Sequence, residues 1–98
     1  MKWIFKTLFV LALIVSSHTA FGATVYIDCS CSTNGDGTGQ TCGASGPKNA
    51  PVTTVSASTD YKYKAGVTCD LASTAITINQ NAVTISSYGT GSKPVITG

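Results

Sequence analysis

The stretch ITINQNAVTISSYGTGSKPVI, residues 76–96, decides the fold class of this chain. Three short runs rich in β-branched residues lie in and beside it, at 75–78, 82–85 and 94–96, and polar, turn-rich segments separate them. Alternate positions of the first two runs are isoleucine or valine, so each run has one apolar face, as a half-buried strand requires. The interval from Ile76 to Val95 suits one coil of a β-solenoid, and it also suits a β-meander. The stretch therefore predicts an all-β fold.

Outward from this stretch, the sequence predicts two more strands and leaves one segment open. Residues 25–27 and 67–69 are also rich in β-branched residues and are predicted to be strands. Residues 52–58 suit either a short helix or a strand, because Pro51 can begin a helix while valine and threonine disfavour one. Residues 61–64, Tyr-Lys-Tyr-Lys, are predicted to form an exposed connector, and a platform for stacking sugars or nucleic-acid bases is the alternative.

The amino-terminal region, residues 1–22, has the organisation of a secretory signal peptide. Two lysines precede an apolar run at residues 8–15, and small residues follow at Ala20 and Gly22. About eight apolar residues are too few for a membrane-spanning helix, which needs roughly 20, so an uncleaved anchor is the disfavoured alternative. We therefore expect cleavage after Gly22. The mature protein would be secreted, whether extracellular, at the cell surface or in a periplasm, with no membrane attachment after cleavage.

Composition excludes several classes of function. The chain has 6 lysines, 4 aspartates and a formal charge of +2, and after Gly22 four lysines balance four aspartates. A neutral chain lacks the basic surface that nucleic acids require, so no nucleic-acid partner is expected. No arginine or glutamate occurs, and the one histidine, His18, lies in the expected leader. Without these residues the mature chain cannot form a Ser-His-Asp triad, a Cys-His pair or a glutamate general acid. We expect no catalytic residue and no cofactor site in this segment.

Four cysteines follow the leader: Cys29, Cys31, Cys42 and Cys69. An even number of cysteines in an exported chain predicts two disulfides. Cys29 and Cys31 are separated by one residue and are poorly placed to bond to each other. Two pairings remain: Cys29 with Cys42 and Cys31 with Cys69, or Cys29 with Cys69 and Cys31 with Cys42. A zinc site is disfavoured because paired C-x2-C spacings are absent, and free or intermolecular thiols are the remaining alternative.

The segment that contains Cys31 and Cys42, residues 30–51, is almost wholly glycine, serine, threonine, asparagine, proline and cysteine. This composition predicts a loop pinned by the disulfides. Within it, Ser32-x-Asn34-x-Asp36-Gly37 resembles the first half of a calcium-binding loop. The twelfth position, which supplies two glutamate oxygens in such loops, is Gly43 here. A plain turn at Asn-Gly and Asp-Gly is therefore favoured, and no metal site is expected in this segment.

Residues 76–96 resemble the early coils of secreted right-handed parallel β-helix proteins of the pectate-lyase-like fold, in which VTI, a short polar step, YGTG and KPVI recur. Upstream segments resemble the amino-terminal plan of that family: a strand with tyrosine at 25–28, a GDGT loop at 35–38, a proline-led segment at 51–55 and a glycine-containing step at 65–68. The resemblance implies a right-handed parallel β-helix, or solenoid. This chain would hold its amino-terminal cap and the first one or two coils, truncated at the carboxyl end.

Together, the leader pattern and the resemblance divide the chain into three regions. They are a signal peptide at 1–22, a cap region at 23–66 that contains the disulfide-pinned loop, and the first coils at 67–98. Asn81 would occupy a tight left-handed corner between two strands, because asparagine tolerates that conformation better than most residues. Gly89 and Gly91 would form the bends of a larger turn.

Members of this family include polysaccharide lyases, hydrolases and epimerases as well as adhesins, and the fold does not decide among them. We expect this segment to be a structural part of an exported β-helix protein that acts on carbohydrate or binds it. Polysaccharide would be bound through the full-length protein, where later coils can hold calcium. A non-enzymatic adhesin and a complete small disulfide-linked secreted protein are the alternatives.

Overall fold

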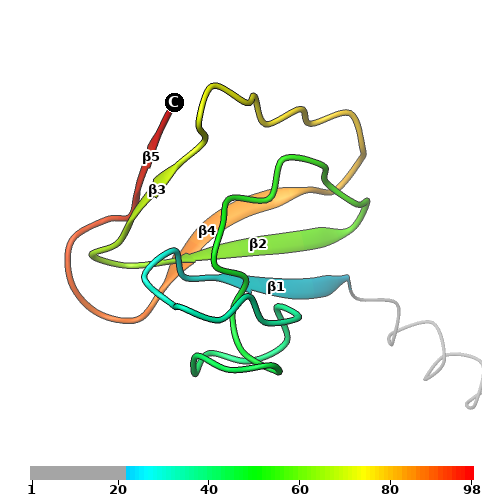
Figure 1. Cartoon of the computed structure of the whole chain (residues 1–98). Coiled ribbons are helices and arrows are strands. Elements are labelled where there is room, and N and C mark those ends of the chain that lie inside the picture. The colour runs from blue at the N-terminus through cyan, green and yellow to red at the C-terminus, as the bar shows by residue number, and fades with distance from the viewer. Residues whose placement is uncertain (1–21) are drawn as a thin grey trace, which may run out of the picture.

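The computed structural model describes residues 22–98, so the expected signal peptide lies outside the described residues except for Gly22 (Figure 1). This part of the chain contains five strands: β1 (Ala23–Ile27), β2 (Thr59–Lys64), β3 (Thr68–Asp70), β4 (Thr84–Tyr88) and β5 (Val95–Thr97). Residues 22–98 contain no helix and therefore no helix long and apolar enough to cross a membrane. The expectation of an all-β chain is confirmed.

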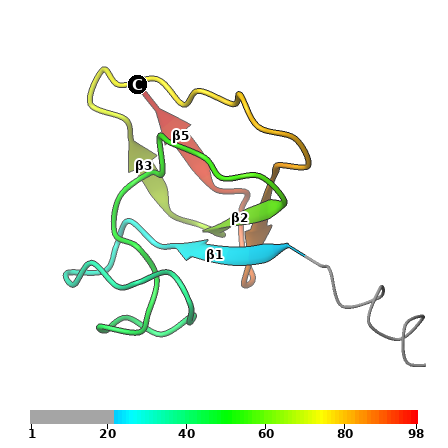
Figure 2. The ribbon, with the colours of Figure 1, turned by 90° about the vertical axis from the view of Figure 1, so that its right-hand side faces the viewer.

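The strands form two parallel sheets. β1, β2 and β4 lie side by side in that order, and β3 pairs with β5, as Figure 1 and Figure 2 show. In the first sheet Val25 lies beside Tyr61, and Tyr61 lies beside Ile85. In the second, Cys69 lies beside Ile96. Because neighbouring parallel strands need a crossover connection, every pairing joins segments that are far apart in the sequence.

The alignment extends beyond the strands. Asp60 lies beside Thr84 in the first sheet, and Thr68 lies beside Val95 in the second. Backbone hydrogen bonds continue the alignment in the turns, from Thr77 to Thr53, Ser58 to Asn81, Gly66 to Ser92 and Leu71 to Thr97. The expected coil interval, from Ile76 to Val95, is wrong as a pairing interval, because the partner of Val95 is Thr68. We call the length of chain between a residue and its partner in the next paired strand a circuit. Each circuit is longer than the sequence pattern predicts.

Three predicted strands agree with the structure to within one or two residues, namely 25–27, 67–69 and 94–96. The run at 82–85 is displaced: β4 begins at Thr84 because the positive φ of 58° at Ala82 interrupts the extended chain. Residues 75–78 form no strand. One isolated parallel bridge joins Thr77 to Thr54. Residues 52–58, for which the sequence allows either a helix or a strand, form no strand that could pair with the rest of residues 75–78.

The exposed connector predicted at residues 61–64 is wrong, since these residues lie in β2, the central strand of its sheet. Tyr61 and Tyr63 are 4% and 2% exposed, whereas Lys62 and Lys64 lie on the opposite face and are partly exposed. The alternation of tyrosine and lysine is the period of a strand with one buried face. The tyrosine rings supply the volume that aliphatic side chains fill in most sheets.

The core lies between the two sheets and is small. Its buried side chains come from β1, β2, β3 and the segment before β2: Ile27, Val55, Tyr61, Tyr63 and Cys69. Partly buried residues pack around them: Val25, Cys29, Val52, Ile76 and Val83. The hydroxyl oxygen of Tyr61 accepts a hydrogen bond of 2.8 Å from the backbone N–H of Ser56. A buried tyrosine thus also holds the chain that leads into β2.

The turn residues predicted around β4 agree with the structure only in part. The left-handed conformation before β4 belongs to Ala82 and not to Asn81. Asn81 instead presents its carbonyl oxygen to the Ser58 N–H at 3.0 Å, so the reversal comes one residue later. Gly89 and Gly91, with φ of 81° and 122°, lie in the bend after β4, where a side chain would be strained.

The segment 30–51, here called the edge loop, runs along the edge of β1 that faces away from β2. Tyr26 donates its N–H to Gly37 at 2.9 Å and accepts from the N–H of Lys48 at 3.0 Å. Both groups of Tyr26 point to the same side of the strand, so the edge loop occupies that edge (Figure 1). Among the described residues no strand pairs with the far edge of β4 or of β5.

Candidate functional site

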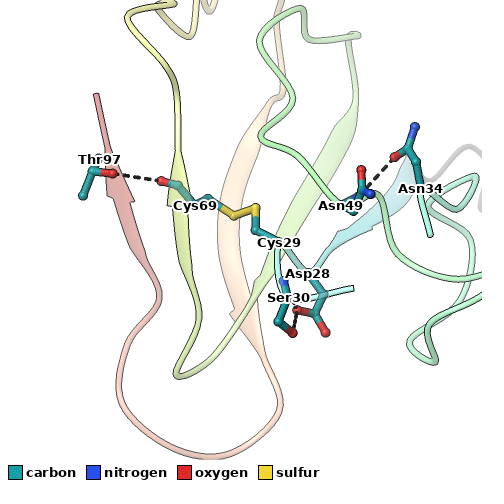
Figure 3. The surroundings of a disulfide bond; sticks show 7 residues. All are labelled: Asp28, Cys29, Ser30, Asn34, Asn49, Cys69 and Thr97. Carbon is teal, nitrogen blue, oxygen red and sulfur yellow. Dashed lines mark hydrogen bonds between the residues drawn. A yellow bond between two sulfur atoms is a disulfide. The ribbon is translucent and has the colours of Figure 1, made fainter. Parts of the chain in front are cut away.

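Both predicted disulfides are present, and the structure selects one of the two pairings left open by the sequence. Cys29 bonds to Cys69 and Cys31 bonds to Cys42, with Cα atoms 5.4 and 5.6 Å apart. The first bond ties the end of β1 to the buried centre of β3, and Figure 3 shows it crossing between them. The second closes the edge loop upon itself. The four cysteines therefore act together as structural links.

Asp28, the residue after β1, is the most enclosed charged group and is 1% exposed. Its carboxylate accepts hydrogen bonds from the backbone N–H of Ser30 at 3.0 Å and from the Ser30 hydroxyl (Figure 3). The Lys64 ammonium lies 3.5 Å away. Burial alone would raise the pKa of Asp28, but the bonds from Ser30 and the charge of Lys64 outweigh it and hold the pKa below its ordinary value. Asp28 is therefore ionised and paired.

A second polar cluster lies on the outward face of the sheet, across β2 and β4. Lys62 Nζ lies 3.1 Å from Asp60 Oδ2 and donates to Ser86 Oγ at 3.2 Å. The Ser86 hydroxyl donates to Asp60 Oδ1 at 2.8 Å. Partial burial would raise the pKa of Asp60, but the hydrogen bonds from Ser86 and Lys62 lower it overall. Because Lys62 neutralises the charge of Asp60 and the pKa of Asp60 is lowered, this carboxylate is a weak base toward the Ser86 hydroxyl.

Two tyrosines complete the outward face. The rings of Tyr26 and Tyr88 meet edge to face, with centroids 5.0 Å apart and planes at 76°. The Tyr88 hydroxyl is buried and has no hydrogen-bond partner among the described residues. Burial raises the pKa of Tyr88, and the nearby Asp28 and Tyr26 raise it further. The outward face thus combines two half-buried tyrosine rings with the ion pair of Asp60 and Lys62.

These outward-facing residues differ from those predicted from the sequence. The alternative of a stacking platform at Tyr61 and Tyr63 is excluded, because both rings lie in the core. The sequence prediction does not single out Tyr26 and Tyr88. The alternation around the first of them is a usable signal, since a residue between the apolar Val25 and Ile27 belongs to the opposite face of the strand.

Among residues 22–98, one group of three side chains has the spacing of metal ligands. One carboxylate oxygen of Asp28 and the sulfurs of Cys31 and Cys42 lie within 4.8 Å of one another, but the two sulfurs are bonded to each other and are not thiolates. In the partial calcium motif, Asn34 Oδ1 accepts from the Asn49 N–H at 3.1 Å and Asp36 Oδ1 accepts from the Thr38 N–H at 2.9 Å. Both oxygens serve the turns of the edge loop, in keeping with the turn interpretation.

A shallow depression of about 300 Å³ lies on the inner side of β4 and β5. Its lining includes the buried ring of Tyr63 and the exposed side chains of Ile85 and Ile96. Comparison of the chain with known protein families, with curated proteins and with solved structures finds no match.

Proposed function

We propose that this chain is the amino-terminal structural segment of an exported right-handed parallel β-helix protein that binds carbohydrate or acts on it. The segment itself contributes no catalytic residue. It covers one end of the stack with the edge loop and offers the edges of β4 and β5 to further strands. Parallel pairing over two successive circuits supports the proposal, because residues 53–71 and 77–97 align in strands and in turns.

The observation that carries the proposal is the exposure of inward-facing side chains in the last strands. Ile85 lies beside Tyr61, which is 4% exposed, yet Ile85 is 45% exposed. Ile96 lies beside Cys69, which is 2% exposed, yet Ile96 is 37% exposed. Inner positions that are buried in one circuit are thus open in the next. A further circuit packed on β4 and β5 would bury Ile85 and Ile96, just as β4 and β5 cover the side chains of β2 and β3.

Export and carbohydrate contact have separate support. The two disulfides are typical of an oxidising compartment, and the leader-like beginning of the sequence favours secretion. The outward face of β1, β2 and β4 carries the half-exposed rings of Tyr26 and Tyr88, and aromatic rings are the residue type suited to stacking on sugar rings.

The transcript downstream of the codon for Gly98 tests the β-helix part of the proposal. We expect it to continue with segments that repeat the apolar alternation at intervals close to those that separate Asp60 from Thr84 and Thr68 from Val95. A stop codon at that point would overturn this part in favour of a small disulfide-linked protein.

Matched variants of the product of that whole reading frame test the stacking itself. Ile85→Lys should strongly reduce the yield of secreted, protease-resistant protein, because the charge would be buried under the next circuit. Thr84→Lys, at the neighbouring outward and exposed position beside Asp60, should leave the yield nearly unchanged. Equal yields from the two variants would contradict burial of Ile85.

The carbohydrate part is tested with the purified secreted product and a panel of acidic and neutral polysaccharides. We expect cosedimentation with at least one polysaccharide, or release of shortened products from it. Absence of both with every member of the panel would overturn this part and favour an adhesin for a different ligand.

A further inference from the structure

Asn34 and Gly35 are a reactive pair by their chemistry. The Gly35 backbone nitrogen can attack the side-chain amide carbon of Asn34, because glycine has no side chain to hinder the approach. A bond forms between Gly35 N and Asn34 Cγ, the bond from Cγ to Nδ2 breaks, and the proton lost from the Gly35 N–H passes through solvent to Nδ2, which leaves as ammonia. The resulting cyclic imide adds water and opens to aspartate or isoaspartate. Either product places a new negative charge beside Asp36.

The edge loop holds both reacting groups in other contacts. The Gly35 N–H donates to the Pro47 carbonyl at 2.9 Å. The Asn34 Oδ1 accepts from the backbone N–H of Asn49 at 3.1 Å, and Figure 3 shows the amide turned toward Asn49. Ring closure removes the proton of the first bond and turns the Asn34 side chain back onto its own backbone. Both hydrogen bonds must therefore be released before the atoms can reach an attacking geometry.

Packing restricts the same backbone. Gly35 is buried, and a Cβ atom built on it would clash with the carbonyl oxygen of Gly46. The two hydrogen-bond partners opposite the pair belong to residues 47–49, which are themselves anchored to β1 through Lys48 and Tyr26. The reactive pair thus lies between two segments of the edge loop, and both segments are bonded to β1: residues 47–49 through Lys48, and the segment that follows the pair through Gly37, whose carbonyl oxygen accepts from the Tyr26 N–H.

The Cys31–Cys42 disulfide closes the part of the loop that contains the pair. Asn34 and Gly35 lie inside the 11-residue separation that this bond spans. Cys42 is exposed, so a thiol reductant can reach its sulfur. In that step the two cysteine sulfurs take up two electrons and two protons, and two thiols of the reductant become a disulfide. Loss of the bond removes the covalent constraint on residues 32–41, and only hydrogen bonds then hold the pair.

We propose that Asn34-Gly35 is a latent deamidation site that the Cys31–Cys42 disulfide keeps closed. Opening the disulfide makes the site reactive, and deamidation then leaves a permanent negative charge on a chain whose expected mature form is neutral. Because deamidation is not reversed when the disulfide forms again, a deamidated edge loop would indicate earlier exposure to a reductant. The inference is independent of the proposed function, since it concerns only the chemistry of the loop.

The test compares three samples incubated together at neutral pH: the disulfide-linked chain, the double variant Cys31→Ser/Cys42→Ser, and a synthetic peptide of residues 32–38. Deamidation is followed by mass spectrometry of the digested chains, with separation of the aspartate and isoaspartate products. We expect the disulfide-linked chain to react at least about tenfold more slowly than the peptide, because two hydrogen bonds must be broken. The double variant should react severalfold faster than the disulfide-linked chain, because without the covalent ring the two hydrogen bonds open more often. A disulfide-linked chain as fast as the peptide, or a double variant as slow as the disulfide-linked chain, would overturn the proposal.

Hydrogen exchange and a second variant separate local opening from unfolding. If the amides of Tyr61 and Tyr63 in β2 stay protected in the double variant, the opening is local, as we expect. If they do not, Asn49→Pro decides the question with both disulfides intact, because proline removes the N–H that holds Asn34 Oδ1. It should accelerate deamidation severalfold, while the control Asn49→Ala, which keeps the N–H, should not. Equal rates in the two Asn49 variants would overturn the proposal.

Discussion

At the scale of single residues, Asp28 links the strand, the loop and the disulfides. Its carboxylate orders the turn at Ser30, its carbonyl oxygen accepts from the Cys31 N–H at 3.1 Å, and Lys64 neutralises its charge. This turn sets the directions in which Cys29 and Cys31 leave β1. In the sequence Asp28 is only the end of a strand, because its partner Lys64 lies far along the chain and becomes a neighbour only through parallel pairing.

Asp28→Ala should lower the free energy of unfolding by about 1–3 kcal/mol, since it removes the hydrogen bonds that order the turn and leaves buried donors without a partner. Asp70→Ala is the matched control. Asp70 also accepts a backbone hydrogen bond from the second residue after it, at 2.9 Å to Ala72, but in an exposed position. Its loss should cost no more than about 0.5 kcal/mol. Urea unfolding followed by tyrosine fluorescence measures both, and equal losses would contradict the role assigned to Asp28.

The lowered pKa values of Asp28 and Asp60 predict the pH dependence of stability. Their ionised forms are favoured in the fold, so their contribution is fully present above the ordinary aspartate value of 3.8. It is lost as the pH falls through the lower pKa values of the folded state. Unfolding by urea at a series of pH values should show stability that declines in this acidic range, with a shallower decline in Asp28→Asn. Stability that increases on acidification would be incompatible with these pKa shifts.

At the scale of elements, β2 is where the sequence prediction fails most clearly. Tyr-Lys-Tyr-Lys is compatible with an exposed connector because each tyrosine has both a polar and an apolar part, and only the pairing with β1 and β4 decides which part is buried. The run at 75–78 shows the opposite case. Its alternation is regular, but the segment opposite it forms a single bridge at Thr54, and a strand needs a partner of several residues.

The candidate site, like the strands, could be predicted from the sequence only in part. The existence of two disulfides follows from the number of cysteines and the expected export. Their pairing does not, because Cys29 and Cys31 are almost equally near to both partners in the sequence, and only the turn at Asp28 separates them. The polar clusters on the outward face require the register of Asp60 with Thr84, which no local pattern contains.

Tyr63→Ala should remove about 3–5 kcal/mol of stability, the usual cost of deleting a buried aromatic ring, since Tyr63 is 2% exposed at the centre of the core. Lys62→Ala, one residue earlier on the outward face of β2, is the control. It breaks a partly exposed ion pair and should cost no more than about 1 kcal/mol. Thermal unfolding measured by circular dichroism compares the two. A Lys62 variant as unstable as the Tyr63 variant would show that the strand faces are assigned incorrectly.

At the scale of the whole molecule, a small core is supported by covalent links. Five buried side chains form the core cluster, and the Cys29–Cys69 bond passes through it to join the first sheet to the second. The Cys31–Cys42 bond lies in the edge loop and joins no strands. The Cys29–Cys69 bond therefore contributes more to the fold than the Cys31–Cys42 bond, although the sequence alone does not distinguish them.

Replacing Cys29 and Cys69 by serine should destabilise the chain more than replacing Cys31 and Cys42. The bonds have sequence separations of 40 and 11 residues, for which loop-closure entropy gives about 4 and about 3 kcal/mol. Serine at the 2%-exposed position of Cys69 adds a cost of buried polarity. Urea midpoints of the two double variants provide the comparison, and the reverse order of stability would contradict it.

The edge loop gives the sheet a direction of growth. With the far side of β1 already occupied, strands can join only on the side of β4, and β1, β2 and β4 follow that order in the sequence as well as in space. If the chain is exported amino end first, the covered edge of β1 would leave the membrane channel before the open edge of β4. In the proposed β-helix each new strand would then find β4 already in place as a template, and the edge loop would keep the sheet from joining head to tail with other copies into a filament.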